Sequence, residues 1–221
     1  MKLIDRELEA GKAYSLLPCH KKNLHQATAS IVDLIARTKG RCYLSLSWGK
    51  QSIILAHMLY HINPHIPCVH WSGPDANIIA DFSSVKNRFL SRWPIKYVEF
   101  DHGDDDLLGN GQRYLVDHDL QGYVIGFAAD ESRARKMTLA KNDDHQIATV
   151  RSALRCTPLR HWTREDYAAY IATHSIPLLS PYRRFGLWVR TSTGVATGGH
   201  SEAGQALLTG SQRAALNKRR K

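Results

Sequence analysis

The sequence has no long uninterrupted hydrophobic run, which argues against a membrane-spanning helix. No apolar stretch approaches the roughly 18 residues that a bilayer span requires. The first residues, Met1 to Glu7, are largely charged and lack the apolar core of a secretory signal. We therefore expect a cytoplasmic protein without a membrane partner.

Cysteine is scarce and never paired locally. The four cysteines are far apart, and none belongs to a Cys-x-x-Cys pair: Cys19, Cys42, Cys68 and Cys156. This spacing argues against a zinc knuckle or an iron–sulfur cluster built from local pairs. Two of them, Cys42 and Cys68, fall in expected strands, where we predict buried apolar side chains.

Acidic residues are outnumbered by basic ones. The chain has 30 Lys and Arg against 20 Asp and Glu, a net charge of +10 at pH 7. Such a balance suits an anionic partner, for example a nucleotide, a nucleic acid or a sulfated metabolite. Several of the charges lie in the last residues, 213–221, where a nucleic-acid contact and a solvated tail are both consistent with the pattern.

Apolar runs alternate with stretches of helical periodicity along most of the chain. Short apolar runs predict strands at residues 41–46, 66–71, 95–100, 123–127 and 155–159. Helical spacing predicts helices at residues 24–38, 53–62, 77–91 and 163–173, and the acidic, Gly-rich stretch 101–111 is expected to be a mobile loop. Strands that alternate with helices imply an α/β, Rossmann-like fold with a parallel sheet and helices on both faces.

This pattern divides the chain into an N-terminal helical segment (1–40), an α/β domain (41–190) and a basic tail (191–221). Ligands of parallel sheets bind beyond the carboxyl ends of the strands. The loops at 45–52, 72–75 and 126–135 are therefore the expected site.

The loop from Ser45 to Ser52 reads Ser-Leu-Ser-Trp-Gly-Lys-Gln-Ser, between a predicted strand and a predicted helix. Backbone N–H groups and the helix dipole favour an anion at such a helix N-terminus. Lys50 adds a positive charge, and Ser45, Ser47 and Ser52 add hydroxyl donors. A phosphate or sulfate group is the expected ligand.

The loop is not a Walker A motif, because Gln51 follows Gly49-Lys50 where that motif requires Ser or Thr. It resembles instead the pyrophosphate loop (PP-loop) Ser-Gly-Gly-Lys-Asp-Ser of the adenine nucleotide α-hydrolase superfamily. The matching residues are Ser47, Gly49, Lys50 and Ser52. Trp48 in place of a Gly and Gln51 in place of the Asp are similar to the phosphoadenylyl-sulfate (PAPS) reductase branch.

Three further segments carry the resemblance in the same order as in that family. Residues 126–135 resemble a Gly-Leu-Arg-x-Glu/Asp-Glu/Gln-Ser segment that is followed by Arg, although Ala128 stands where the family has Arg. Residues 157–163 resemble its Pro-Leu-x-x-Trp-Thr segment, and residues 174–182 its His-x-Leu-Pro-x-x-Pro-Leu-Tyr stretch. The similarity spans about residues 40–190.

The resemblance implies an adenine nucleotide, ATP or PAPS, as the ligand of this site. It places the adenosine near Ser72, Gly73 and Asp75, and it makes Arg133 and Arg135 a catalytic clamp together with Lys50. The nucleotide contacts that it implies come from Ser45, Ser47, Trp48, Gly49, Lys50, Gln51, Ser52, Gly126 and Ser132. Asp130 and Glu131 could hold Mg²⁺ against phosphates, or pair with the arginines at the surface.

One part of the family pattern is missing. PAPS reductases attack the sulfur with a cysteine in a C-terminal Glu-Cys-Gly-Leu-His segment, and no cysteine follows Cys156 here. The sequence leaves open cleavage at an ATP α-phosphate, a PAPS reductase or sulfotransferase-like enzyme with an external nucleophile, and a degenerate nucleic-acid-binding module. It is also compatible with a homo-oligomer.

Histidine is frequent, but the sequence identifies no metal site. His57 and His61 are four residues apart on one predicted helix, as metal ligands can be, and no third ligand is evident. We predict that they lie at the surface or the edge of the core, and that His70 has a structural role in its strand.

Overall fold

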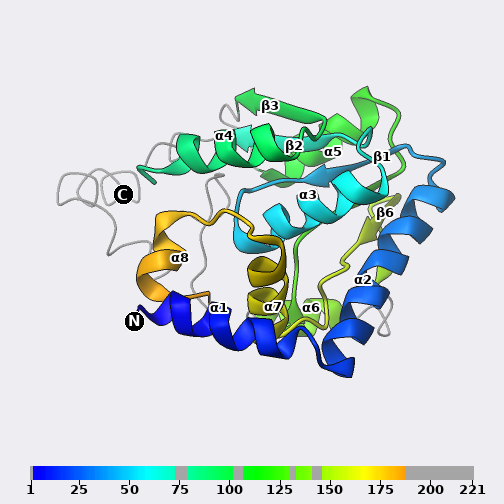
Figure 1. Ribbon diagram of the computed structural model, residues 1–221. Coiled ribbons are helices and arrows are strands. Elements are labelled where there is room, and N and C mark those ends of the chain that lie inside the picture. Colours follow the sequence, from blue (N-terminus) through cyan, green and yellow to red (C-terminus); the bar gives the residue numbers. More distant parts are fainter. Residues whose placement is uncertain (1, 73–78, 102–106, 130–132, 141–145, 188–221) are drawn as a thin grey trace, which may run out of the picture.

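The computed structural model describes residues 2–72, 79–101, 107–129, 133–140 and 146–187 (Figure 1). A single six-stranded sheet runs through them in the order β3-β2-β1-β4-β6-β5, and only β5 is antiparallel to its neighbour. The strands are β1 (Cys42–Ser45), β2 (Cys68–Ser72), β3 (Tyr97–Asp101), β4 (Gly122–Val124), β5 (Ile147–Val150) and β6 (Ala153–Cys156). The helices are α1 (Leu3–Tyr14), α2 (Pro18–Arg37), α3 (Lys50–Ile62), α4 (Phe82–Arg92), α5 (Leu107–Asp117), α6 (Arg133–Ala140), α7 (Arg164–His174) and α8 (Ser180–Phe185).

Helices cover both faces of the sheet. Since the side chains of each strand alternate between the faces, both faces have apolar side chains that the helices bury. On β1, Cys42 and Leu44 join the main core, which α2, α3, α4 and α7 share. Tyr43 points the other way and packs edge-on against Tyr114 of α5, with ring centroids 5.2 Å apart. The α/β fold class predicted from the sequence is confirmed.

The first helix lies along α7, as Figure 1 shows at the lower edge of the molecule. Gly11 makes this approach possible, because a Cβ atom there would lie 2.5 Å from the backbone carbon of Ala168. A hydrogen bond from the Leu187 amide to a Glu7 carboxylate oxygen, 2.7 Å long, joins α1 to the second residue after α8. The N-terminal helix therefore braces the two C-terminal helices.

The order of the strands reverses beside β1. From β1 the chain adds β2 and then β3 on one side, and it later returns to add β4 on the other side. The loops that leave the carboxyl ends of the neighbouring strands β1 and β4 therefore start at this reversal, which is where open α/β sheets bind ligands.

The element bounds confirm most of the sequence expectations and correct a few. Residues 107–111 are the start of α5 rather than a loop; Tyr114 and Leu115 of this helix are buried against the sheet, and this burial outweighs the low helix propensity of two glycines. The predicted strand at 155–159 begins earlier, at Ala153, and ends at Cys156. The predicted helix 77–91 begins only at Phe82.

The predicted capping box of α7 is present: the Thr163 amide donates to Asp166, at 2.9 Å. Cys42 and Cys68 are buried in their strands as predicted. Within the described part of the chain, no helix is long and apolar enough to cross a membrane.

Candidate functional site

The loop between β1 and α3 holds its shape through one serine. The Ser52 hydroxyl donates to the carbonyl oxygen of Gly49 at 3.1 Å and accepts from the amide of Ser47 at 3.1 Å. Its oxygen also lies 3.2 Å from the Ser47 hydroxyl oxygen. These bonds close residues 47–52 into a compact turn, so the loop is formed before any ligand arrives.

Trp48 anchors the loop to the core. Its backbone is left-handed, with φ of 58°, which costs a residue with a Cβ atom roughly 1–2 kcal/mol. Its ring is 1 % exposed and packs edge-on against Phe82, Phe89 and Tyr97, with centroids 5.6–6.1 Å apart. This packing offsets the strain, and it means that only the backbone of Trp48 is placed to contact a ligand at the loop surface.

The first turn of α3 is capped by a distant residue. Gly49 is the N-cap and has no side chain with which to cap the helix. The Lys50 amide instead donates to the phenol oxygen of Tyr182, on α8, at 2.9 Å. The positive end of the helix dipole lies beyond the carboxyl end of β1, where it favours a negative charge.

Two tyrosines from the C-terminal helices surround the side chains of this turn. The Lys50 ammonium nitrogen lies 5.5 Å from the ring centre of Tyr167 and 5.8 Å from that of Tyr182. The Gln51 side-chain amide donates to the Tyr167 hydroxyl at 3.3 Å. Sequence reasoning missed both contacts, although Tyr182 ends a motif that it recognised.

The loop after β4 touches the same turn. A Cβ atom on Gly126 would lie 2.8 Å from the Cβ atom of Gln51 and 3.3 Å from the Ser52 amide nitrogen. Only a residue without a side chain permits this approach. The structure thus brings together the loops after β1 and β4, as the strand order requires.

Solved structures with the same architecture have phosphate-containing ligands. A PAPS reductase from Candida auris, solved as a phosphate complex, superposes with a TM-score of 0.54 at 9% identity, over 70% of this chain and 82% of that one. An FMN adenylyltransferase from Candida glabrata, solved with FAD and inorganic pyrophosphate, superposes with a TM-score of 0.60 at 14% identity, over 80% of this chain and 66% of that one. Neither a protein-family model nor a curated protein sequence matches the chain.

Both neighbours belong to the PP-loop, adenine nucleotide α-hydrolase-like group. This chain shares the fold of these neighbours. The resemblance seen in the sequence is therefore confirmed at the level of the fold. Residues 45–52, which resemble the PP-loop of that group in sequence, are called the PP-loop below.

Other predicted site residues lie around the PP-loop or outside the described residues. Ser45 and Ser72 are half-buried at the carboxyl ends of the neighbouring strands β1 and β2. Arg133 begins α6 with an exposed side chain. Outside the described residues lie Gly73, Asp75, Asp130, Glu131, Ser132 and the side chain of Arg135. The arginine clamp and the Mg²⁺ ligands stay predictions.

The predicted position of the α3 histidines, at the surface or the edge of the core, is wrong for His57 and correct for the exposed His61. His57 is buried, and its ring centre lies 4.7 Å from that of His61 and 4.8 Å from that of His174, on α7. Its Nδ1 is 2.7 Å from the hydroxyl of Tyr170. Nevertheless, the described residues include no group of three His, Cys, Asp or Glu that could hold a metal ion.

Burial and the neighbouring His174, His61 and Arg92 lower the pKa of His57 to about 3, so its ring is neutral at pH 7. His70 has the structural role that we predicted: it is buried, and its Nδ1 lies 2.9 Å from the carbonyl oxygen of Leu46, the second residue of the PP-loop.

No cysteine that the structure describes is placed near the PP-loop as a nucleophile. Cys156 is fully buried, and its thiol lies 3.5 Å from the carbonyl oxygen of Ser30 in α2. Burial raises the pKa of this thiol to about 12, so it is protonated at pH 7. Cys19 is exposed at the start of α2, where its sulfur lies 3.5 Å from the Tyr14 hydroxyl.

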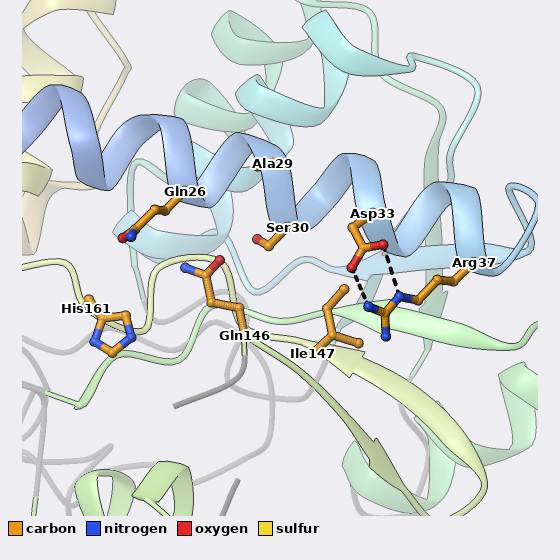
Figure 2. Close-up of a pocket in the computed structure, with 8 residues that line it drawn as sticks. All are labelled: Gln26, Ala29, Ser30, Asp33, Arg37, Gln146, Ile147 and His161. Carbon is orange, nitrogen blue, oxygen red and sulfur yellow. Dashed lines mark hydrogen bonds and ion pairs between the residues drawn. The ribbon is translucent and has the colours of Figure 1, made fainter. Parts of the chain in front are cut away.

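A cavity of about 600 Å³ lies elsewhere, between α2 and the start of β5 (Figure 2). Its lining is Gln26, Ala29, Ser30, Asp33, Arg37, Gln146, Ile147 and His161. Arg37 faces the cavity but already pairs with Asp33, at 2.8 and 3.0 Å. We favour the PP-loop as the site, because the cavity contains no predicted site residue and offers an anion no helix N-terminus.

Proposed function

We propose that this protein is a PP-loop enzyme that binds an adenine nucleotide, ATP or PAPS, and cleaves it at the α-phosphate or the sulfate. The observation that carries the proposal is the preformed turn at the start of α3, which lies at the switch point of the sheet and contains Lys50. Backbone donors and a lysine beside a helix N-terminus match the charge of a pyrophosphate or sulfate group.

The ligands of the structural neighbours support the same choice. The Candida auris reductase was solved with phosphate, and the Candida glabrata adenylyltransferase with ATP and with pyrophosphate. Both reactions that we consider transfer a group from an adenine nucleotide, and both develop negative charge on a leaving phosphate: pyrophosphate when the α-phosphorus of ATP is attacked, and the 5′-phosphate of adenosine 3′,5′-bisphosphate when the sulfur of PAPS is attacked.

The cysteines favour a nucleophile from outside the chain. Cys156 is buried and protonated, and Cys19 lies at the start of α2 rather than beside the PP-loop. With PAPS, an external thiol would have to attack the sulfur; with ATP, an acceptor oxygen would attack the α-phosphorus and release pyrophosphate. Mg²⁺ would assist the second reaction, with Asp130 and Glu131 as the proposed ligands.

The test is calorimetric titration of the purified protein with ATP plus Mg²⁺, PAPS and adenosine 3′,5′-bisphosphate. Lys50→Ala should weaken binding by about 1–3 kcal/mol, or roughly 5- to 150-fold in Kd, because it removes a charge-assisted contact. Lys96→Ala is the matched control, since this exposed lysine precedes β3, at the amino ends of the parallel strands, whereas the PP-loop follows the carboxyl end of β1.

Each result of the titration has a defined meaning. Preference for PAPS or the bisphosphate indicates a sulfonucleotide site, and preference for ATP indicates acceptor adenylation. Equal affinities of wild type and Lys50→Ala for every nucleotide would refute the site. If no nucleotide binds, the nucleic-acid hypothesis based on the basic tail (191–221) comes first, and steep salt dependence of DNA or RNA binding would test it.

A further inference from the structure

We propose that Tyr167 and Tyr182 are positioning residues of the PP-loop, which hold Lys50 and the first turn of α3 in the geometry that receives the pyrophosphate or sulfate group. This inference rests on the proposed function. It assigns a task to α7 and α8, whose residues lie more than 100 positions beyond the PP-loop in the sequence.

The first part of the inference concerns the ammonium group. Lys50 is 5 % exposed and lies over two aromatic rings, at 5.5 and 5.8 Å from their centres. The faces of aromatic rings attract cations. Lysine otherwise loses substantial rotamer freedom when it binds a ligand, so a side chain that is already held between Tyr167 and Tyr182 binds at a lower entropic cost.

The second part concerns the backbone. Because Gly49 cannot cap the helix, the Tyr182 hydroxyl accepts the hydrogen bond of the Lys50 amide, at 2.9 Å. A tyrosine on another helix thus fixes where the first turn of α3 begins. Tyr167 adds a bond from the Gln51 side chain, at 3.3 Å, on the same turn.

The two tyrosines are themselves held in place. The buried Asp166, next to Tyr167, accepts hydrogen bonds from Asn23 and from the Thr163 amide at 2.9 Å, and it lies 2.8 Å from His20 Nδ1. These bonds tie the start of α7 to α2.

The start of α8 is fixed in a similar way. The Ser180 amide donates to Asp81 at 3.0 Å, and Arg183 lies 3.5 Å from the same carboxylate. Rigid neighbours of this kind hold a binding group in place before the ligand arrives.

The test measures inorganic pyrophosphate affinity by calorimetry for the full-length protein and four variants. Tyr182→Phe loses only the hydroxyl and should bind roughly 3- to 10-fold more weakly. Tyr167→Leu and Tyr182→Leu lose a ring each and should bind more weakly than Tyr182→Phe. Tyr170→Phe is the matched control: it lies on α7, is buried, and loses a hydroxyl that contacts His57 rather than the PP-loop. Its affinity should equal that of wild type.

A double-mutant cycle separates positioning from general destabilisation. Because the ammonium contacts pass through the Lys50 side chain and the contacts to the Lys50 amide and to Gln51 do not, the Leu substitutions should cause a smaller loss of affinity in a Lys50→Ala background than in wild type. Full additivity would overturn the inference, as would wild-type affinity of both Leu variants. A loss of affinity in Tyr170→Phe equal to that in Tyr182→Phe would also overturn it.

A measurement without ligand distinguishes this inference from the proposed function. Protons of the Lys50 side chain that lie over ring faces should resonate upfield in the NMR spectrum, and Tyr167→Leu should remove part of this shift. If wild type shows the shift but binds no pyrophosphate or nucleotide, the proposed function fails and the positioning stands. If the shift is absent, the positioning fails whatever the protein binds.

Discussion

The first turn and the middle of α3 each place a basic residue beside a tyrosine hydroxyl, but the two places differ in their chemistry. At the first turn, the Lys50 amide donates to the hydroxyl of Tyr182. Two turns later the contact is made by a side chain, since Nδ1 of His57 lies 2.7 Å from the hydroxyl of Tyr170. In both places a basic residue of α3 is buried against aromatic rings of the C-terminal helices.

The difference lies in the backbone. The first amides of a helix have no carbonyl partner within it and carry the positive end of the dipole, whereas the amides around His57 belong to the continuous helix. Of these two places, only the first turn therefore offers helix amides without a carbonyl partner in the helix beside a buried basic group, as the proposed anion site requires. In the middle of the helix, burial and neighbouring cationic groups lower the pKa of His57 to about 3 and keep the ring neutral.

The largest predicted effect is the dependence of folding stability on pH that His57 causes. The folded protein binds a proton at His57 only near pH 3, whereas an unfolded histidine binds one near pH 6.5. The contribution of neutral His57 to stability is therefore complete above pH 6.5 and is lost as the pH falls toward 3, by an amount on the order of a few kcal/mol.

Urea unfolding from pH 7 to 4 measures this effect. His57→Gln should flatten the decline of stability in the acid range, because it removes the titrating group. An equally steep decline in wild type and variant would contradict the assignment to His57, and pyrophosphate affinity at pH 7 should not change.

The next effect concerns the close contact between Gly126 and the PP-loop. Gly126→Ala places a Cβ atom 2.8 Å from that of Gln51, so the loops after β1 and β4 must separate. Overpacking of this kind costs about 1–3 kcal/mol, and we expect roughly tenfold weaker nucleotide binding. Calorimetry of Gly126→Ala measures it. Gly40→Ala is the control for backbone strain without crowding, because Gly40 has φ of 77° with open space around it and lies before β1; it should lower stability but leave the affinity unchanged. Wild-type affinity of Gly126→Ala would show that the two loops do not share a site.

The smallest effect concerns the hydrogen bonds of Ser52 inside the PP-loop. Ser52→Ala removes the hydroxyl that closes the turn between Ser47 and Gly49. The expected loss is about 0.5–1.5 kcal/mol in the free energy of nucleotide binding, with little change in the structure around His57. Titration together with an NMR spectrum checks both: shifts confined to residues near the PP-loop would support the interpretation, and shifts that reach His57 would contradict it.

Local sequence predicted the elements of the site better than its assembly. The strand that ends at Ser45, the helix that ends at Ile62 and the Thr163 capping box follow from local patterns. The edge strand β5 was not predicted, because its four residues are mostly half-buried and show no alternation. The helix α5 was missed since its glycines disfavour a helix that only packing against the sheet stabilises.

The sequence alone determined the fold class and predicted a candidate anion site, because both depend on short-range patterns: alternating strands and helices, and small residues before a helix. Only the tertiary structure decided how Lys50 is held. Its partners, Tyr167 and Tyr182, lie more than 100 residues away, and nothing in their spacing predicts a contact. The physical reason is that cation–π contacts and the capping of α3 depend on how α7 and α8 pack, and the whole core sets that packing.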